Sequence, residues 1–318
     1  MNTPTRDASA PTVHSLNCFV LSVPDLTVAR RFYESFGLDV TQKHGRLELR
    51  TTATDHKWAE IVESGRGSKR FEYLSFGCYQ HDFDKFAAYV NTRAFTTCNP
   101  HELATPEGIW LTHPDGYPIQ IVVAEKTMPD HDVTPSIVPA TGLRGAVAPG
   151  RSRVGRTMPR RLSHVLLFSS DVLGALAFFE AALGLRLSDR SGDGIAFMHG
   201  IHGSDHHMVA IAKSHGPGFH HASWDVASLD EVGNGMEQMA KAGYTQGWGV
   251  GRHVLGSNYF YYVRDPWGSY CEYSFDIDYV PKGHAWPARD HAPEDCFYMW
   301  GPPVPEEFVT NYERQGVP

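Results

Sequence analysis

Residues 18–38, "CFVLSVPDLTVARRFYESFGL", recur in altered form as residues 164–185, "HVLLFSSDVLGALAFFEAALGL". Each copy begins with an apolar run, passes an aspartate at the position of a helix N-cap, Asp25 or Asp171, and reaches a glycine near its end. Apolar residues recur at helical spacing between the aspartate and the glycine. The repeat predicts a strand followed by an amphipathic helix in each copy.

The similarity between the two halves of the chain continues downstream. Residues 71–79, "FEYLSFGCY", correspond to residues 219–227, "FHHASWDVA", and "LTHPDGYPIQIVV" (111–123) corresponds to "YVRDPWGSYCEYS" (262–274). The Pro-x-Gly of the last pair predicts a hairpin turn between two strands. A second cap-and-helix pattern follows each central strand, within "HDFDKFAAYVNTRAF" and "SLDEVGNGMEQMAKAGY". Each half therefore contains two strand-helix-strands units.

The repeat predicts an α+β fold of four βαβββ modules, paired into two incompletely closed barrel domains. A connector rich in Pro, Gly and Arg separates the halves, and an aromatic segment follows the second half. The predicted parts are a flexible N-terminus (1–13), an N-terminal domain (14–126), a linker (127–160), a C-terminal catalytic domain (161–279) and an aromatic extension (280–318). We expect the extension to pack near the mouth of the second barrel, because it is too aromatic for solvated disorder.

The composition excludes several classes of protein. The chain has 318 residues, a hydrophobic fraction of 42% and a formal net charge of -8. These values are typical of a globular protein of two ordinary domains, and the negative charge disfavours a nucleic-acid partner. No apolar run approaches the roughly 18 residues that a membrane span needs, and the start of the chain lacks a signal-peptide pattern. We expect no membrane partner and a cytoplasmic location.

The cysteines indicate neither a disulfide framework nor a zinc knuckle. They are odd in number, scattered and without a CxxC pair: Cys18, Cys78, Cys98, Cys271 and Cys296. We expect reduced and mostly buried thiols.

The two halves differ in the side chains that could bind a metal. At three matching points of the repeat, potential ligands occur only in the second half: His164, His221 and Glu272 stand where the first half has Cys18, Tyr73 and Gln120. If both halves fold alike, the three positions converge on one cavity. Two imidazoles and one carboxylate form the facial triad of non-haem iron(II) enzymes, which leaves coordination positions open. The first half is expected to be structural.

Strand alternation does not by itself decide which histidine of the "HH" pair faces this site. His221 shares one face of the strand with Ser223, and His220 lies on the other face. The repeat does not decide either, since Glu72 and Tyr73 both fit as the counterpart.

Three stretches carry a resemblance to a known family: "LSHVLLFSSD" (162–171), "GFHHASWDV" (218–226) and "GRHVLGSNYFYYVRDPWGSYCEY" (251–273). They resemble the vicinal oxygen chelate superfamily and, within it, the type I extradiol dioxygenases of the catechol 2,3-dioxygenase and homoprotocatechuate 2,3-dioxygenase group. The similarity spans most of residues 14–279. Its most specific motif matches at six positions: Gly251, His253, Tyr262, Pro266, Gly268 and Glu272. Tyr261 departs conservatively from the family's aliphatic residue or Phe.

The resemblance implies both a site and a reaction. It makes His221, the second histidine of the pair, a metal ligand with His164 and Glu272, and it makes His207 the acid-base residue, with His206 as the alternative. His253 and Tyr262 are expected to hydrogen-bond the substrate. The implied cofactor is Fe(II), with Mn(II) accepted by the same ligands. The implied reaction cleaves a substituted catechol beside its diol with O2, giving a 2-hydroxymuconic semialdehyde-type product, in a homo-oligomer, with a tetramer favoured.

Two other functions remain open within the same superfamily. One is a glyoxalase-like isomerase or lyase that uses a divalent metal without redox chemistry. The other is a metal-free binding protein of the bleomycin-resistance type. The first would need none of His207, His253 and Tyr262, and the second would not need the triad. The ring substituent of the substrate is not readable from the sequence, so alkyl, aryl and carboxylated catechols all remain candidates.

Overall fold

The structure is a computed structural model, and it describes residues 9–65, 67–131 and 150–313. The first half comprises β1 (Ser15–Val23), α1 (Leu26–Phe36), β2 (Asp39–Lys43), β3 (Arg46–Thr51), β4 (Thr54–Glu63), β5 (Arg70–Cys78), α2 (Gln80–Thr92), β6 (Ile109–Thr112) and β7 (Pro118–Val123). The second half comprises β8 (Arg161–Ser169), α3 (Val172–Phe178), β9 (Arg186–Ser191), β10 (Ile195–His199), β11 (Ser204–Asp205), β12 (Val209–Lys213), β13 (Gly218–Asp225), α4 (Leu229–Lys241), β14 (Gly247–His253), β15 (Tyr259–Arg264) and β16 (Tyr270–Phe275). The C-terminal segment adds β17 (Tyr279–Val280), β18 (Arg289–Asp290) and β19 (Tyr298–Trp300), and short 3-10 turns lie at Arg151–Arg153, Pro293–Asp295 and Glu306–Val309.

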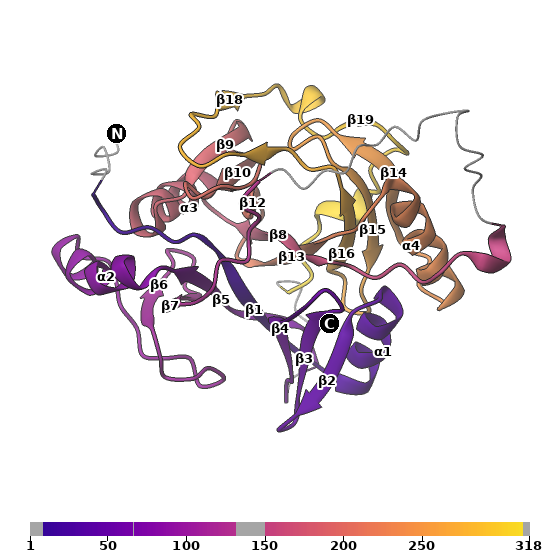
Figure 1. Cartoon of the computed structure of the whole chain (residues 1–318), viewed down its shortest axis with the longest axis horizontal. Helices are drawn as coiled ribbons and strands as arrows, with labels where there is room; N and C mark the ends of the chain where they lie inside the picture. Colours follow the sequence, from indigo (N-terminus) through magenta and orange to yellow (C-terminus); the bar gives the residue numbers. More distant parts are fainter. Residues whose placement is uncertain (1–8, 66, 132–149, 314–318) are drawn as a thin grey trace.

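The two halves are built on two sheets with the same strand order, which confirms the internal repeat. The 7-stranded sheet has the order β2-β3-β4-β1-β5-β7-β6, and the 10-stranded sheet contains the equivalent run β9-β10-β12-β8-β13-β16-β15. Within the described residues no pairing joins the edge strands of either sheet. The predicted α+β class with incompletely closed barrels is therefore confirmed (Figure 1).

The helix boundaries follow the caps that the repeat indicated. The Asp25 side chain accepts hydrogen bonds from the backbone N–H groups of Thr27 and Val28, and α1 ends at Gly37, whose φ is 102°. Asp171 caps α3 in the same way through the N–H of Gly174. The second copy differs at its end, because α3 passes into a π-helical turn, Phe179–Leu183, before the left-handed Gly184.

One module departs from the predicted βαβββ pattern. After α2 the chain forms only two regular strands, β6 and β7, and in place of the expected first strand it has an isolated bridge, Thr97 to Leu111. The segment between α2 and β6 carries Pro100 and Pro106, which have no N–H group and cannot donate to a strand ladder. Without this strand, the sheet of the first half has fewer strands than the sheet of the second half.

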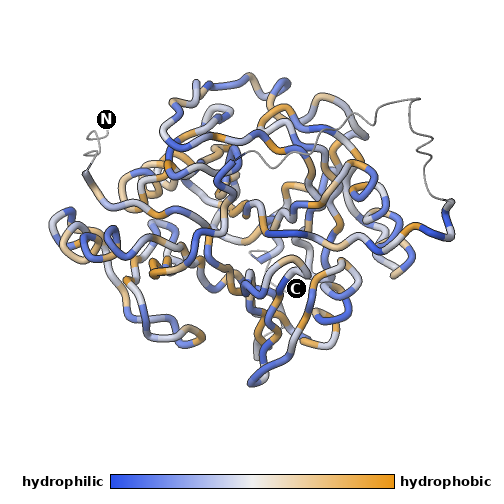
Figure 2. Tube along the Cα trace, in the orientation of Figure 1, coloured by the Kyte–Doolittle hydropathy of each residue, from blue (hydrophilic) through white to orange (hydrophobic). Residues whose placement is uncertain are grey.

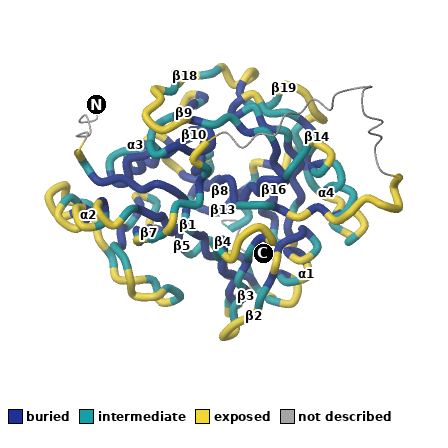
Figure 3. The backbone as a smooth tube through the Cα atoms, in the orientation of Figure 1, coloured by how far each residue is buried: buried dark blue, intermediate teal, exposed yellow. Residues whose placement is uncertain are grey.

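The cores of the two halves merge into one apolar cluster. Phe36 of α1 stacks on Tyr273 of β16 with ring centroids 3.9 Å apart, and Phe19 of β1 stacks on Phe219 of β13 at 5.2 Å. The central strands are buried in Figure 3, whereas the tip of the β2–β3 hairpin is exposed there and hydrophilic in Figure 2. This shared core holds the second sheet, which carries the site, against the first.

The C-terminal segment also fastens the halves together. Both carboxylate oxygens of Glu313 accept backbone hydrogen bonds, from the N–H of Phe71 in the first half at 2.9 Å and from the N–H of Phe219 in the second at 2.8 Å. Beside it, Lys69 of the first half forms a buried ion pair with Asp265 of the second.

The domain boundaries drawn from the sequence stay a prediction. Residues 1–8 of the predicted flexible N-terminus and residues 132–149 of the predicted linker lie outside the described residues. Thr12 and Val13 are buried, and the N–H of Val13 donates to the carbonyl of Leu183.

The cysteines are as expected, since all five are free thiols and only Cys98 is not buried. Of the helices in the described residues, none has the length and apolar character needed to span a bilayer.

Candidate metal centre and active site

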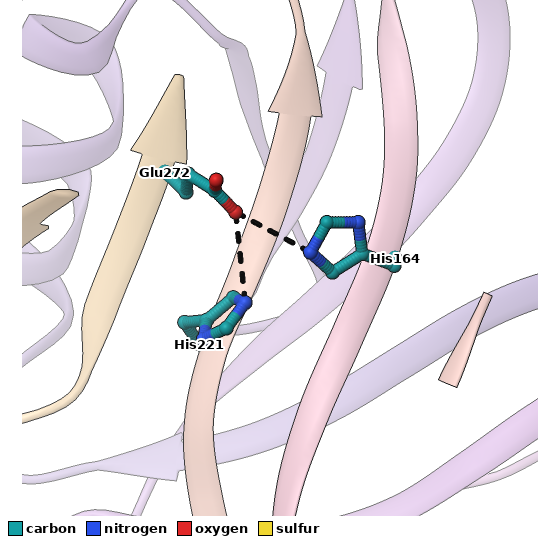
Figure 4. Close-up of side chains that lie close together, drawn as sticks. All are labelled: His164, His221 and Glu272. Atoms are coloured by element: carbon teal, nitrogen blue, oxygen red, sulfur yellow. Dashed lines mark ion pairs between the residues drawn. The ribbon is translucent and has the colours of Figure 1, made fainter. Parts of the chain in front are cut away.

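Three neighbouring strands bring His164, His221 and Glu272 together. In the register of the sheet, Ser223 of β13 pairs with His164 of β8 on one side and with Glu272 of β16 on the other. His221 lies two residues from Ser223 on the same central strand. Side chains at alternate positions share a face, so all three point to one side of the sheet (Figure 4).

The three side chains have the geometry of an open metal site. Their ligand atoms lie within 4.8 Å of one another, and no other such group of three occurs among the described residues. The Glu272 Oε2 atom is 3.3 Å from Nε2 of His164 and 3.6 Å from Nε2 of His221. Glu272 is 0% exposed, yet its Oε2 and the Nε2 of His221 have no hydrogen-bond partner. Buried polar atoms are rarely left unpaired, so this pair of atoms fits a bound cation.

A hydrogen-bond chain fixes the orientation of His164. The Ser163 hydroxyl donates to Asp205 at 2.7 Å, so its oxygen is left to accept from Nδ1–H of His164, 3.2 Å away. Arg161 in turn donates to the Asp205 carboxylate at 2.6 Å. With the proton on Nδ1, the lone pair of Nε2 is free to face the site.

His221 is oriented by the histidine next to it. The carbonyl oxygen of Phe308 can only accept, so Nε2–H of His220 donates to it at 2.7 Å, and Nδ1 of neutral His220 accepts from Nδ1–H of His221 at 2.6 Å. Burial lowers the pKa of His220 to about 4, despite the opposing effect of the Phe308 bond, which keeps the ring neutral. The free lone pair of His221 is therefore on Nε2, toward Glu272.

The expectation from strict alternation that His220 lies on the opposite face is wrong. The β8–β13 register shifts between Phe219 and His221, and both histidines line the same cavity. A β-bulge adds one residue to the strand and so turns the neighbouring side chain toward the same side.

The two candidates for the acid-base role lie in different surroundings. His207 lines the cavity with its ring centroid 4.0 Å from that of His164, whereas His206 is fully buried behind it and does not line the cavity. His206 donates from Nε2 to Asp189 at 2.9 Å, and its Nδ1 lies 3.0 Å from Nδ1 of His207. Burial, followed by the neighbouring histidines, lowers the pKa of His207 well below its usual value.

His253 and Tyr262 form a pair at the opposite side of the site. The Nδ1–H of His253 donates to the carbonyl of Phe297 at 2.7 Å, which leaves Nε2 to accept from the Tyr262 hydroxyl at 2.9 Å. Burial and then the nearby Glu272 raise the pKa of Tyr262 well above its usual value, so its hydroxyl stays protonated. Trp248 stacks against the back of Tyr262 at 5.6 Å and fixes the ring.

These residues line one cavity. The remaining wall is apolar apart from Asn258 and consists of Leu166, Ile195, Phe197, Leu255, Cys296, Phe297 and Phe308. No lysine, arginine or aspartate lies among its described lining residues. The C-terminal segment supplies Cys296, Phe297 and Phe308, as expected for an extension packed at the mouth.

The equivalent place in the first half holds a different set of side chains. The registers pair Cys18 with Ser75 and Ser75 with Gln120, as His164, Ser223 and Glu272 are paired in the second half. Tyr73 and Trp110 pack there with Val20 and leave no comparable ligand set among the described residues. The predicted correspondence of the two sites is confirmed.

Sequence reasoning missed three contributors to the site. The role of His220 as partner of His221 depends on the bulge, and Phe308 depends on how the extension returns to the barrel. Asn258, which is 1% exposed and donates to Glu272, belongs to no spacing pattern and could be found only from coordinates.

The comparisons with known proteins agree with this site. The sequence profile of the Glyoxalase/Bleomycin resistance protein/Dioxygenase superfamily matches residues 161–273. The chain belongs to the extradiol dioxygenases of the vicinal oxygen chelate superfamily. A relative that shows this membership is metapyrocatechase 2 of Cupriavidus necator, which is 53% identical over 302 residues, 95% of this chain and 93% of that protein. Biphenyl-2,3-diol 1,2-dioxygenase of Metapseudomonas furukawaii is 31% identical over 147 residues, 44% of this chain and 46% of that protein.

Solved structures share the fold across nearly the whole chain. A variant of homoprotocatechuate 2,3-dioxygenase from Brevibacterium fuscum superposes with a TM-score of 0.77 at 20% identity and covers 98% of this chain and 84% of that one. The Mn(II)-bound glyoxalase from Novosphingobium aromaticivorans gives a TM-score of 0.72 at 23% identity and covers 93% and 94% of the two chains.

Proposed function

We propose that this chain is an Fe(II)-dependent extradiol dioxygenase that cleaves a catechol with an uncharged ring substituent, using O2, to a 2-hydroxymuconic semialdehyde-type product. The single observation that carries the proposal is the buried triad of His164, His221 and Glu272, which opens on a cavity also lined by His207, His253 and Tyr262. The family membership and the metapyrocatechase relative support it. Mn(II) suits the same donor set. A homotetramer and a cytoplasmic location stay predictions.

The ion held by the triad would supply a Lewis-acidic, redox-active centre at which a diol and dioxygen meet and exchange electrons. Among the described residues, the Glu272 carboxylate is the one fixed charge of the triad, and the cavity wall adds no lysine, arginine or aspartate. Burial acts to raise the pKa of Glu272, but the adjacent His164, followed by His253, lowers it overall, so it stays anionic. A dication beside one carboxylate is balanced by a catechol bound as a monoanion.

The side chains around the cavity would hydrogen-bond the diol and accept or return its protons. Tyr262, protonated, fixed by Trp248 and donating to His253, would accept at its oxygen from the remaining hydroxyl of the diol and so hold the asymmetric monoanion. Neutral His207 would take a proton at Nε2 and later return it as the O–O bond breaks. The Asp189–His206 pair behind its Nδ1 keeps Nε2 directed at the cavity.

The absence of a cation in the described cavity wall supports an uncharged substituent. A carboxylate on the ring would be buried without a partner, at a cost of several kcal/mol. Leu166, Ile195 and Phe197 offer apolar contact instead, which favours alkyl or aryl groups.

The test is a substrate profile that includes a carboxylated catechol and its uncharged methyl ester. Chain loaded anaerobically with Fe(II) is given catechol, methylcatechols, 2,3-dihydroxybiphenyl, homoprotocatechuate or the methyl ester of homoprotocatechuate, and then air. We expect oxygen consumption with a yellow product, and a kcat/KM for the ester at least about 100-fold above that for the free acid, the factor given by about 2.7 kcal/mol. Absence of ring cleavage with every catechol contradicts the reaction, and a preference for the acid contradicts the uncharged substituent.

A further inference from the structure

Asn258 is a buried amide in direct contact with the carboxylate of the triad. Its Nδ2 group donates to Oε1 of Glu272 at 3.0 Å and to Oγ of Ser274 at 2.9 Å. Both amide hydrogens are thereby used. Among the contacts of Glu272, the one from Asn258 engages the carboxylate oxygen that faces away from the two histidines.

The loop before β15 holds Asn258 in place. The carbonyl of Asn258 accepts from the N–H of His253 at 2.9 Å, and Ser257 donates from Oγ to Asp278 at 2.8 Å. Gly256 has a φ of 87°, and a Cβ there would lie 3.3 Å from Cε1 of His207 and 3.5 Å from Oδ1 of Asn258. The positive φ favours glycine at this position, and the turn it makes sets the backbone from which Asn258 reaches Glu272.

The third polar atom of Asn258 distinguishes it from an ordinary core residue. Its Oδ1 is buried without a hydrogen-bond partner, and the residue lines the cavity. An amide placed only for packing would have its acceptor satisfied as well. The arrangement instead leaves Oδ1 without a partner beside the cavity, while Nδ2 is used on Glu272 and Ser274.

We propose that Asn258 is a positioning residue that holds Glu272 in a one-oxygen binding mode, with Oε1 tied back and Oε2 presented to the ion. This inference rests on the proposed function of the triad as a metal site. With Oε1 held, the carboxylate cannot rotate to bind through both oxygens, and the side of the ion opposite the protein stays open for a diol. The role belongs to this chain's own loop and is separate from the proton chemistry.

The test replaces Asn258 with an apolar residue of similar shape and measures metal affinity. The Asn258→Leu variant and wild type are titrated with Mn(II) alone, by calorimetry and by loss of the free-ion EPR signal, and the metal-free proteins are melted. We expect Mn(II) affinity to fall about 10- to 100-fold, as is usual when a hydrogen bond to a metal ligand is removed. The EPR spectrum of the bound ion should also change.

A matched control separates this role from the loss of any buried amide. Asn311 is 2% exposed and donates only to the backbone carbonyls of Gly216 and Pro217. Asn311→Leu should lower the melting temperature and leave Mn(II) affinity unchanged. If Asn258→Leu does not fold, Asn258→Ala, which leaves room for water, is measured in its place.

Two results would overturn the inference. One is an unchanged Mn(II) affinity in folded Asn258→Leu or Asn258→Ala, and the other is an equal loss of affinity in Asn311→Leu. Failure of the proposed function looks different: a wild type that binds neither Mn(II) nor Fe(II) at a one-to-one ratio contradicts the metal site, and a wild type that binds the ion without cleaving any catechol contradicts the reaction.

Discussion

At the scale of single residues, each imidazole in the site has its free nitrogen set by what its other nitrogen contacts. The carboxylate of Asp205, the carbonyl of Phe308 and the carboxylate of Asp189 can only accept hydrogen bonds. Asp205 fixes the proton of His164 through Ser163. The Phe308 carbonyl fixes that of His221 through His220. Asp189 fixes that of His207 through His206. Three buried acceptors thus prepare three Nε2 lone pairs for the cavity.

His207 is the residue whose removal should separate metal binding from turnover. The His207→Phe variant keeps the triad and the shape of the ring, so we expect unchanged Fe(II) content by metal analysis. Turnover of an alkylcatechol should fall about 10²- to 10⁴-fold, the usual contribution of a general acid or base. Turnover near that of wild type, at equal iron content, would remove His207 from the mechanism.

The residues that the sequence predicted are those that belong to a spacing. His253, Tyr262 and Glu272 lie on three successive antiparallel strands, β14, β15 and β16, at fixed separations, and strand geometry carries such separations directly into space. Asn258 and His220 were not predictable as contributors, because the first depends on a loop conformation and the second on a bulge. Neither feature has a periodic signal in the sequence.

At the scale of elements, the packing of α4 on β16 positions the strand that carries Glu272. Gly235 of α4 lies against the ring of Tyr273, the residue next to Glu272, and a Cβ at Gly235 would be 2.7 Å from that ring. Tyr273 is in turn held by Phe36, to whose carbonyl its hydroxyl donates at 2.7 Å. The helix can therefore approach the strand only without a side chain at this point.

We expect Gly235→Ala to destabilise the protein by about 1–3 kcal/mol, because the added methyl group overpacks a fixed aromatic ring. Gly233→Ala is the matched control in the same helix, since its Cβ would meet nothing within 4 Å. That change should stabilise by up to about 1 kcal/mol through helix propensity. Urea unfolding of the metal-free variants measures both, and equal stabilisation by the two alanines would contradict the packing argument.

The elements themselves were predicted well where cap, periodicity and turn agreed. Asp25, Gly37 and the Pro-x-Gly hairpins gave boundaries that the structure confirms. The missing strand after α2 was not foreseen, because the repeat suggested a strand that Pro100 and Pro106 prevent. The missing N–H groups of the two prolines therefore decided the local structure, although the second half of the chain forms a strand at the matching place.

At the scale of the whole molecule, a buried histidine lies where the halves meet. His113 of the first half stacks on Tyr117 at 4.3 Å and meets the ring of Phe178 of the second half at 4.8 Å. Its Nδ1 accepts from the N–H of Asp115, and burial lowers its pKa to about 3. The folded protein therefore keeps this ring neutral in weak acid.

This histidine makes the stability depend on pH. Its folded pKa lies below the unfolded value of about 6.5, so its contribution is fully present above that pH and is lost as the pH falls toward 3. At pH 5.0 the loss is about 2 kcal/mol relative to pH 7.5. We expect His113→Phe to lose less unfolding free energy than wild type over this interval, by that amount. Parallel pH profiles of the two metal-free proteins would contradict the assignment.

The C-terminal segment has two roles: it ties the two halves together and it lines the cavity. Through Glu313 it ties Phe71 to Phe219, and through Phe297 and Phe308 it forms a wall of the reaction chamber. The backbone carbonyls of the same two phenylalanines accept from His253 and His220. Replacing the Phe297 or Phe308 ring would therefore reshape this wall, whereas the carbonyls that orient His253 and His220 belong to the backbone and do not depend on which side chain is present.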